Sequence, residues 1–182
     1  MATSKTPKKP ATERAAPRKP DAIALLKEDH QKVSALFEQY GKSRSASKKQ
    51  SIVADICREL SIHATVEEEI FYPAVKAALK DKELVPEATI EHATIKEFIA
   101  KVDGKVPDGE MFDAHIQVMG EYVKHHVKEE QTEMFPKARK TNLDMLELGQ
   151  RILDRKQELM ADPESIPKEP SALAKLPEHE SV

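Results

Sequence analysis

The feature that most constrains the fold of this chain is a spacing of apolar residues by three and four, which recurs in four long segments. That spacing places apolar side chains on one face of an α-helix, and each run is too long for a β-strand. The pattern predicts helices over about residues 21–40, 53–79, 86–102 and 112–136. Four helices of this length predict an all-α protein, an up-down-up-down four-helix bundle.

Composition supports this class. The 182 residues are enough for one domain, and with no Trp, 4% aromatic and 34% charged residues an all-β fold is excluded. No apolar run is long enough for a membrane span and no secretory signal is evident, so we expect a cytoplasmic protein without a membrane partner. The single cysteine, Cys57, excludes an internal disulfide and a cysteine-based zinc site.

The distribution of charged residues and prolines divides the chain into a folded body and two terminal segments. Residues 1–20 carry six cationic residues, one acidic residue and four prolines, which predicts a disordered basic arm. Residues 161–182 carry five acidic residues, two lysines and four prolines, which predicts a disordered acidic tail. Between them we expect the bundle over 21–140 and a short accessory helix over 141–160. The positive charge of the basic arm would allow it to bind nucleic acid. The arm lacks interleaved aromatic residues and a groove-reading motif, so we favour a solubilising role for it. The sequence indicates no protein partner.

Six polar residues occupy helical positions where core residues are expected. Burying a carboxylate without a partner costs several kcal/mol, so these residues need compensation from one another or from a cation. The six are His30, His63, Glu67, His92, His126 and Glu130.

The arrangement of these residues repeats. The pattern H-x3-E-x4-[YF]-P begins at His63 and again at His126, and an acid-histidine pair, Asp29–His30 or Glu91–His92, precedes each copy by 33 or 34 residues. The chain is therefore read as two copies of one helical hairpin. Packed about a pseudo-twofold axis, the two hairpins bring all six residues to one level.

Four imidazoles and two carboxylates are too many donors for one tetrahedral zinc. Carboxylates that project between facing helices are a common means of holding two metals in a bundle. Imidazole and carboxylate without thiolate favour iron or manganese, with zinc as a possible substitute.

The sequence also resembles a known family over about residues 21–140. The segments that carry the resemblance are DAIALLKEDHQKVSALFEQY, HATVEEEIFYPAV, EHATIKEF and HHVKEEQTEMFPKAR. They resemble the hemerythrin-like, or HHE cation-binding, family. The resemblance implies a four-helix bundle with a non-haem di-iron centre, ligand roles for the six residues above, and Glu67 and Glu130 as the bridging carboxylates.

The chain departs from the oxygen-carrying hemerythrins at Lys96, where those proteins have a further histidine one turn after the first histidine of the third helix. A lysine at neutral pH is an ammonium, so Lys96 is predicted to lie beside the site without binding metal. The missing donor is replaced by water, by Glu68 or Glu129, or by the phenolate of Tyr122. These alternatives remain open from the sequence.

Other candidate residues are assigned outside the site. The repeat selects His126 over its neighbour His125, and His115 lies too far along the helix to share the metal of His126. His179 falls in the predicted tail, and Cys57 is interpreted as a buried, unreactive thiol.

Four classes of function follow. The first is binding or sensing of dioxygen or nitric oxide, the second a di-iron redox enzyme acting on peroxide or nitric oxide, the third iron handling, and the fourth a purely structural bundle. Because Lys96 replaces a histidine, binding, sensing or iron handling is favoured over bulk oxygen transport, and the enzyme is the alternative.

Overall fold

The computed structural model describes residues 20–80 and 83–167, which form helices and loops without any β-strand. The predicted basic arm lies outside the described residues except for Pro20, and the predicted acidic tail lies outside them from residue 168 onward. No helix in the described ranges is long and apolar enough to cross a membrane.

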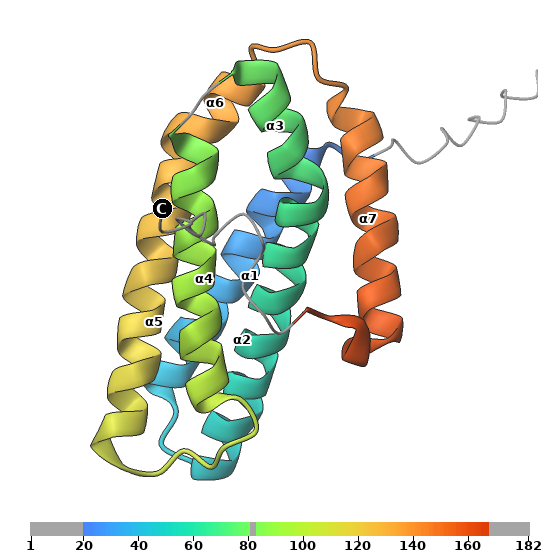
Figure 1. Cartoon of the computed structure of the whole chain (residues 1–182). Helices are drawn as coiled ribbons and strands as arrows, with labels where there is room; N and C mark the ends of the chain where they lie inside the picture. The colour runs from blue at the N-terminus through green and yellow to red at the C-terminus, as the bar shows by residue number, and fades with distance from the viewer. Residues whose placement is uncertain (1–19, 81–82, 168–182) are drawn as a thin grey trace, which may run out of the picture.

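Four long helices run up and down and pack side by side, as the apolar spacing predicts (Figure 1). They are α1 (Ala22–Lys42), α2 (Ala46–Val66), α4 (Leu84–Val102) and α5 (Gly109–Glu129). The prediction of an all-α four-helix bundle with an additional short helix is confirmed.

Side-chain caps set where the first two helices begin. The carboxylate of Asp21 accepts the N–H of Ala24 at the start of α1, and the hydroxyl of Ser45 accepts the N–H of Lys48 at the start of α2. Each cap satisfies one of the backbone donors that a helix N-terminus leaves unpaired. Since the α1–α2 connection is short, the two helices are antiparallel neighbours.

The chain passes through a π-helical turn shortly before Pro73. Glu67–Phe71 (η1) joins α2 to α3 (Tyr72–Leu79), and Glu130–Met134 (η2) joins α5 to α6 (Phe135–Ala138) in the same way. In each turn a backbone N–H bonds to the carbonyl five residues earlier, which inserts one residue ahead of the proline. The proline then sits in the first turn of the next helix, where its missing N–H is tolerated.

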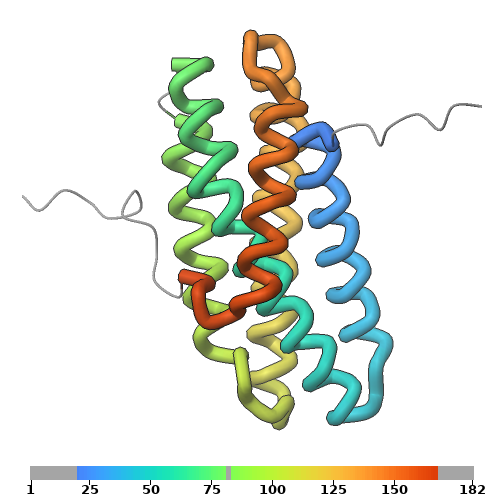
Figure 2. Tube along the Cα trace, turned by 90° about the vertical axis from the view of Figure 1, so that its right-hand side faces the viewer, coloured from blue at the N-terminus to red at the C-terminus, as the bar shows by residue number. Residues whose placement is uncertain are grey.

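The predicted accessory helix is α7 (Met145–Ala161), which packs across the α1–α2 face of the bundle (Figure 2). Asp144 caps its start by accepting the N–H groups of Leu146 and Glu147. After α7, a short 3₁₀ turn, Pro163–Ser165 (η3), returns the chain, and Ile166 packs against the core.

The apolar core is divided into two clusters along the bundle. One includes Leu26, Val66 and Phe71 and lies toward α3, α6 and α7; the other includes Val33 and Met119 and lies toward the opposite end. In α1, α4 and the segment from α5 into η2, the polar residues of the repeat lie between members of the two clusters, and in α2 His63 and Glu67 begin just past the boundary between the clusters, which lies between Leu60 and Ile62. The fold therefore places a polar layer in the middle of an apolar interior.

The contact between α7 and the start of α1 gives a test of this packing. A Cβ atom on Gly149 would lie 2.0 Å from the carbonyl oxygen of Pro20 and 2.8 Å from the N atom of Ala22. Gly149→Ala should therefore lower the free energy of unfolding by about 1–3 kcal/mol, the usual cost of overpacking. Urea denaturation followed by circular dichroism measures the change.

Gly41→Ala is the matched control. Nothing lies within 4 Å of a Cβ atom placed on this helical glycine. We expect no loss, or a gain of up to about 1 kcal/mol from reduced backbone freedom in the unfolded chain. Equal effects of the two substitutions would contradict the described packing of α7.

Candidate metal centre

The first group of potential ligands joins α1, α2 and the two π-helical turns. The imidazole Nε2 atoms of His30 and His63 lie 3.1 Å apart. Nε2 of His63 lies 3.1 Å from Oε2 of Glu67, and Nε2 of His30 lies 3.2 Å from Oε2 of Glu130. All four residues are buried, and their ligand atoms lie close enough to surround one metal ion.

The second group repeats this geometry across the pseudo-twofold axis. Nε2 of His92 and Nε2 of His126 lie 3.1 Å apart, and Oε2 of Glu67 lies 3.4 Å from His92. Glu67, His92 and His126 form a second set that could surround a metal ion. Nε2 of His126 also lies 3.5 Å from Oε2 of Glu130. The structure thus brings together all six residues that the repeat singled out, with both carboxylates between the two pairs of histidines.

Local helical geometry explains this convergence. His63 and Glu67 are four residues apart, as are His126 and Glu130, so each pair shares one helix face. Each glutamate is also the first residue of a π-helical turn.

The carboxylates provide a direct test of whether a cation fits. Oε1 of Glu67 and Oε2 of Glu130 are buried and make no hydrogen bond within the described part of the chain. A buried carboxylate oxygen without a donor is strongly unfavourable, and a bound cation would satisfy it. The donor set of imidazoles and carboxylates, with two orphaned oxygens, fits two metal ions.

Each of the four histidines directs its Nδ1 atom outward to a fixed partner. In the first half, Nδ1 of His63 donates to Asp29 at 3.3 Å, and the side-chain amide of Gln131 lies 3.1 Å from Nδ1 of His30. Such partners fix ring orientation and leave Nε2 facing the centre.

In the second half both partners are carboxylates. Nδ1 of His126 donates to Oε2 of Glu91 at 2.8 Å, and Nδ1 of His92 donates to Oε1 of Glu68 at 3.1 Å. The acid that precedes the first histidine of each hairpin thus orients the second histidine of the same hairpin. This explains why Asp29–His30 and Glu91–His92 occur as pairs in the sequence.

Two buried lysines support these carboxylates. Nζ of Lys96 lies 2.8 and 2.9 Å from the two oxygens of Glu68, beside the site as predicted. Nζ of Lys156, from α7, donates to Oδ1 of Asp29. Lys156 was not predicted as part of the site, because α7 carries no motif related to the repeat.

The ionisable groups are strongly perturbed in the metal-free protein. Burial opposes a charge on His63, but the neighbouring carboxylates of Glu67 and Asp29 raise its pKa to about 10. Burial also favours a neutral Glu67, yet the charges and hydrogen bonds of His63 and His92 hold its pKa well below the usual range. The centre therefore retains protons on imidazole that a cation would have to displace.

Tyr72 is a second site residue, besides Lys156, that the sequence analysis missed. Its hydroxyl donates to Oε1 of Glu130 at 3.0 Å and lies 3.3 Å from Nε2 of His92. Burial and the charges of Glu130 and Glu67 raise its pKa well above the ordinary value, so the phenol keeps its proton. The signal was present in the repeat, where Tyr72 occupies the position of Phe135.

The alternatives for the missing donor are placed as follows. Tyr122 is 45% exposed and packs against Phe98, so it does not reach the centre. Glu68 supports His92 from outside, and Glu129 lies near the exposed His125. Of these three residues, none lies among the buried ligand atoms.

The residues assigned outside the site also have clear positions. His126 is buried in the centre, whereas the side chain of His125 is 59% exposed. Nδ1 of His115 donates to the carbonyl of Met111, away from the centre. Burial raises the pKa of the Cys57 thiol to about 12, as expected for an unreactive cysteine, and His179 lies outside the described residues.

A small apolar void adjoins the four histidines. Its volume is about 10 Å³, which is at the lower limit for one water-sized molecule. Besides the histidines and Asp29, it is lined by Val33, Leu60, Ala64, Ile95, Val123 and Val127.

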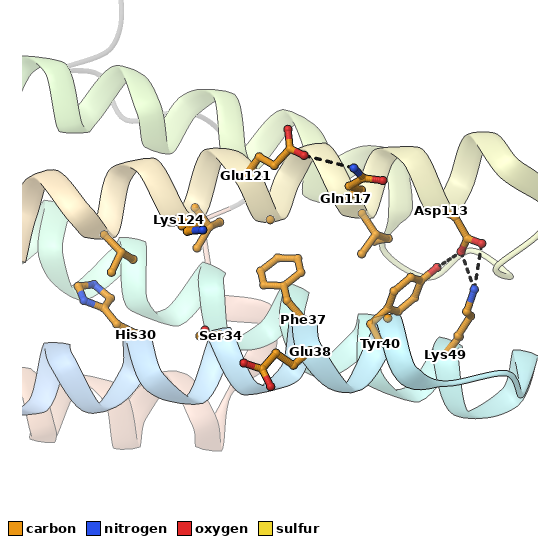
Figure 3. Close-up of a pocket in the computed structure, with 15 residues that line it drawn as sticks. His30, Ser34, Phe37, Glu38, Tyr40, Lys49, Asp113, Gln117, Glu121 and Lys124 are labelled. Atoms are coloured by element: carbon orange, nitrogen blue, oxygen red, sulfur yellow. Dashed lines mark hydrogen bonds and ion pairs between the residues drawn. The ribbon is translucent and has the colours of Figure 1, made fainter.

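A larger groove of about 760 Å³ runs between α1 and α5 (Figure 3). His30 lies at one end, and the hydrogen-bonded group of Tyr40, Lys49 and Asp113 lies at the other. His30, Val123 and Val127 line both the groove and the small void. Among the described residues, these three side chains connect the surface groove to the interior of the centre.

Comparison with known proteins agrees with this geometry. The sequence model of the Hemerythrin HHE cation binding domain matches residues 21–138. The chain belongs to the hemerythrin HHE cation-binding family. Together with the buried histidine and glutamate clusters, this membership identifies a hemerythrin-like metal-binding protein.

Two known proteins are similar to this HHE chain. A solved hemerythrin HHE cation binding domain-containing protein from Mycobacterium kansasii is 20% identical, with a TM-score of 0.68, and the match covers 78% of this chain and 88% of that one. This structural similarity supports the assignment of the fold. A protein from Nostoc sp. described as a DNA nickase is 26% identical over 111 residues, or 61% of this chain and 31% of that protein. The HHE chain therefore matches less than a third of the length of this curated relative.

The pKa of His63 predicts how the stability of the metal-free protein depends on pH. The folded-state pKa of about 10 lies above the ordinary value of 6.5, so protonation of His63 favours folding. This contribution is fully present below pH 6.5 and is lost as pH rises through about 10. Urea denaturation in the presence of a chelator should show the free energy of unfolding falling over this range.

His63→Gln removes the titrating group and should flatten this part of the profile. His115→Ala, on the exposed side of α5, should leave the profile unchanged. Parallel profiles for the original protein and His63→Gln would contradict the assignment of the shift to His63.

Proposed function

We propose that this chain binds two non-haem irons, with Glu67 and Glu130 shared between them, and uses them to bind or sense dioxygen or nitric oxide. The observation that carries the proposal is the pair of buried donor groups that share Glu67, with an orphaned carboxylate oxygen on each glutamate. Bound iron would supply an open coordination position and electrons for a small diatomic ligand.

The roles of the protein residues follow from their contacts. His30, His63, His92 and His126 would hold the metals through Nε2, because their Nδ1 atoms already have partners. Tyr72 holds a proton at its hydroxyl, directed at Oε1 of Glu130. Manganese or zinc suits several of the same donors, so iron is the preferred rather than the exclusive metal.

The apolar lining of the small void favours a diatomic ligand. Dioxygen and nitric oxide have little polarity and lose little hydration on entering such a space, whereas water or an anion would lose hydrogen bonds. The shared lining by His30, Val123 and Val127 makes the α1–α5 groove the route by which such a ligand reaches the void.

A di-iron redox enzyme acting on peroxide or nitric oxide is the second candidate. The buried hydroxyl of Tyr72 favours it, because it places one proton donor within hydrogen-bonding distance of a carboxylate and an imidazole of the centre. A proton donor at that point would assist reduction of a bound oxygen species.

Spectroscopy on iron-loaded protein tests these functions. Anaerobic ferrous loading, then mixing with air-saturated or nitric oxide-containing buffer, should produce a charge-transfer absorption if the chain binds the diatomic ligand. Steady-state peroxide consumption, compared between the original protein and Tyr72→Phe, tests the enzyme. Rapid consumption that Tyr72→Phe reduces would favour the enzyme, and stable ligand spectra without turnover would favour binding or sensing.

Metal content gives a specific prediction for the two shared carboxylates. The original protein should bind about two irons per chain after ferrous loading, as a carboxylate-bridged centre requires. Glu67→Ala or Glu130→Ala should abolish the pair, because each removes a buried ligand and leaves its partner histidines uncompensated. Metal analysis of folded protein measures this.

His115→Ala is the control and should retain both irons, since its side chain bonds to Met111 away from the centre. A reproducible content of one iron or none in the original protein would refute the dinuclear centre. Equal losses in His115→Ala and Glu67→Ala would show that the ligands on α5 are misassigned.

Val127 gives a prediction for ligand access. Its side chain is half-buried between the groove and the void. Val127→Ala should accelerate binding of nitric oxide to the ferrous protein, and Val127→Phe should slow it, with little change in metal content. Stopped-flow absorbance measures both rates.

Val118→Ala, at an exposed position of α5 outside the groove lining, is the matched control and should behave like the original protein. If Val127→Ala, Val127→Phe and Val118→Ala all bind nitric oxide at the original rate, the ligand does not enter between these pockets.

A further inference from the structure

A second group of metal-binding side chains lies on the surface outside the buried centre. Nε2 of His125 lies 3.4 Å from Oε1 of Glu91 and 3.4 Å from Oε1 of Glu129. These three atoms are close enough to bind one cation, and the side chain of His125 is 59% exposed. We refer to Glu91, His125 and Glu129 as the outer triad.

Glu91 connects the outer triad to the buried centre. Its Oε1 faces His125, while its Oε2 accepts the Nδ1–H of His126, a residue of the second ligand group. A cation on the outer triad would therefore be one carboxylate away from a histidine of the centre.

The same region contains a small cavity bordered by four carboxylates. The cavity, of about 10 Å³, is lined by Leu84, Glu87, Ala88, Glu91, Glu129, Glu130 and Met134. Glu130 is 1% exposed and contributes one of the two orphaned carboxylate oxygens. The cavity thus lies between two members of the outer triad and a shared carboxylate of the buried centre.

Within residues 20–80 and 83–167, the ion pairs of these carboxylates involve only histidines. Among the ion pairs of residues 20–80 and 83–167, none joins a lysine or arginine to Glu87, Glu91 or Glu129. Clustered carboxylates without a counter-charge raise the local concentration of divalent cations.

The internal duplication shows what the other half has in its place. The counterparts of His125 and Glu129 in the first hairpin are Ile62 and Val66, both buried in the apolar cluster that α7 covers. The counterpart of Glu91 is Asp29. One oxygen of Asp29 accepts from His63 and the other accepts from Lys156, a permanent cation. In the first half, the ammonium of Lys156 on α7 is fixed against Asp29. In the second half, the corresponding surface carries two potential ligands, His125 and Glu129.

We propose that the outer triad captures Fe²⁺ from solution and delivers it through the carboxylate-lined cavity to the buried centre. This inference rests on the proposed di-iron function. Three donors at an exposed position, completed by water, bind a divalent ion weakly, as transfer requires. Each transfer exchanges water and outer ligands for buried imidazole and carboxylate, without any change in oxidation state.

The rate of iron uptake tests the proposal. Metal-free full-length protein is mixed anaerobically with limiting Fe²⁺, and a chromogenic ferrous chelator reports the free iron remaining at successive times. The double variant H125A/E129Q should take up iron at least about tenfold more slowly, the scale of electrostatic steering. Its final content should still be two irons per chain, because it retains all six buried residues.

The variant H115A/E97Q is the matched control, since it removes the same residue types and charge elsewhere on α5 and α4, from a half-buried position at His115 and an exposed one at Glu97. It should take up iron at the original rate. The advantage of the original protein over H125A/E129Q should shrink at high salt, where steering is screened.

A separate measurement examines the outer triad itself. Protein already loaded with two irons is titrated with Mn²⁺, and the electron paramagnetic resonance signal of free Mn²⁺ is recorded. One additional weakly bound ion is expected, and H125A/E129Q should lose it.

The outcomes separate this inference from the proposed function. Two irons bound at equal rates by the original protein and H125A/E129Q would overturn the capture site while leaving the di-iron centre intact. Absence of a third bound ion in the original protein would also overturn it. Failure of the original protein to bind iron would overturn both proposals.

Discussion

The structure depends on the burial of two carboxylates, Glu67 and Glu130, between two apolar clusters. Each has an oxygen without a hydrogen bond, and the pair is surrounded by four imidazole Nε2 atoms. Placing charge in such an interior is unfavourable unless cations or protonated groups neutralise it. This one constraint accounts for the histidines at core positions, for the network that holds each Nδ1, and for the raised pKa of His63 in the metal-free protein.

Much of this arrangement is predictable from the sequence, because helical periodicity and spacing depend on local chain geometry. The four helices and the meeting of the six residues follow from apolar steps of three and four and from the repeated H-x3-E pattern. The role of Tyr72 does not follow, because a tyrosine beside Pro73 reads as an apolar core residue until its hydroxyl is placed against Glu130. The role of Lys156 depends on how α7 docks, which no pattern within α7 specifies.

The two halves of the duplication differ in the residues that surround the corresponding histidines His30 and His92. Tyr72 faces His92, while the corresponding Phe135 stacks on His30; Glu68 receives the Nδ1–H of His92, while the amide of Gln131 lies at His30. A carboxylate partner makes an imidazole a stronger donor than an amide partner does. The two groups of potential ligands are therefore chemically different, with stronger donation expected from the group that contains His92 and His126.

The position of α7 adds a second asymmetry, in access rather than in donor strength. By covering the α1–α2 face, α7 buries Ile62 and Val66 and fixes an ammonium on Asp29, which stabilises that half. In the half built from α4 and α5, the side chain of His125 is 59% exposed, and among the described residues the ion-pair partners of Glu91 are His125 and His126. A centre sealed on both faces would be stable but slow to fill, whereas one open on both faces would expose its carboxylates to water and weaken their hold on the histidines. Covering one half and leaving the other accessible would reconcile a buried centre with the metal uptake proposed above.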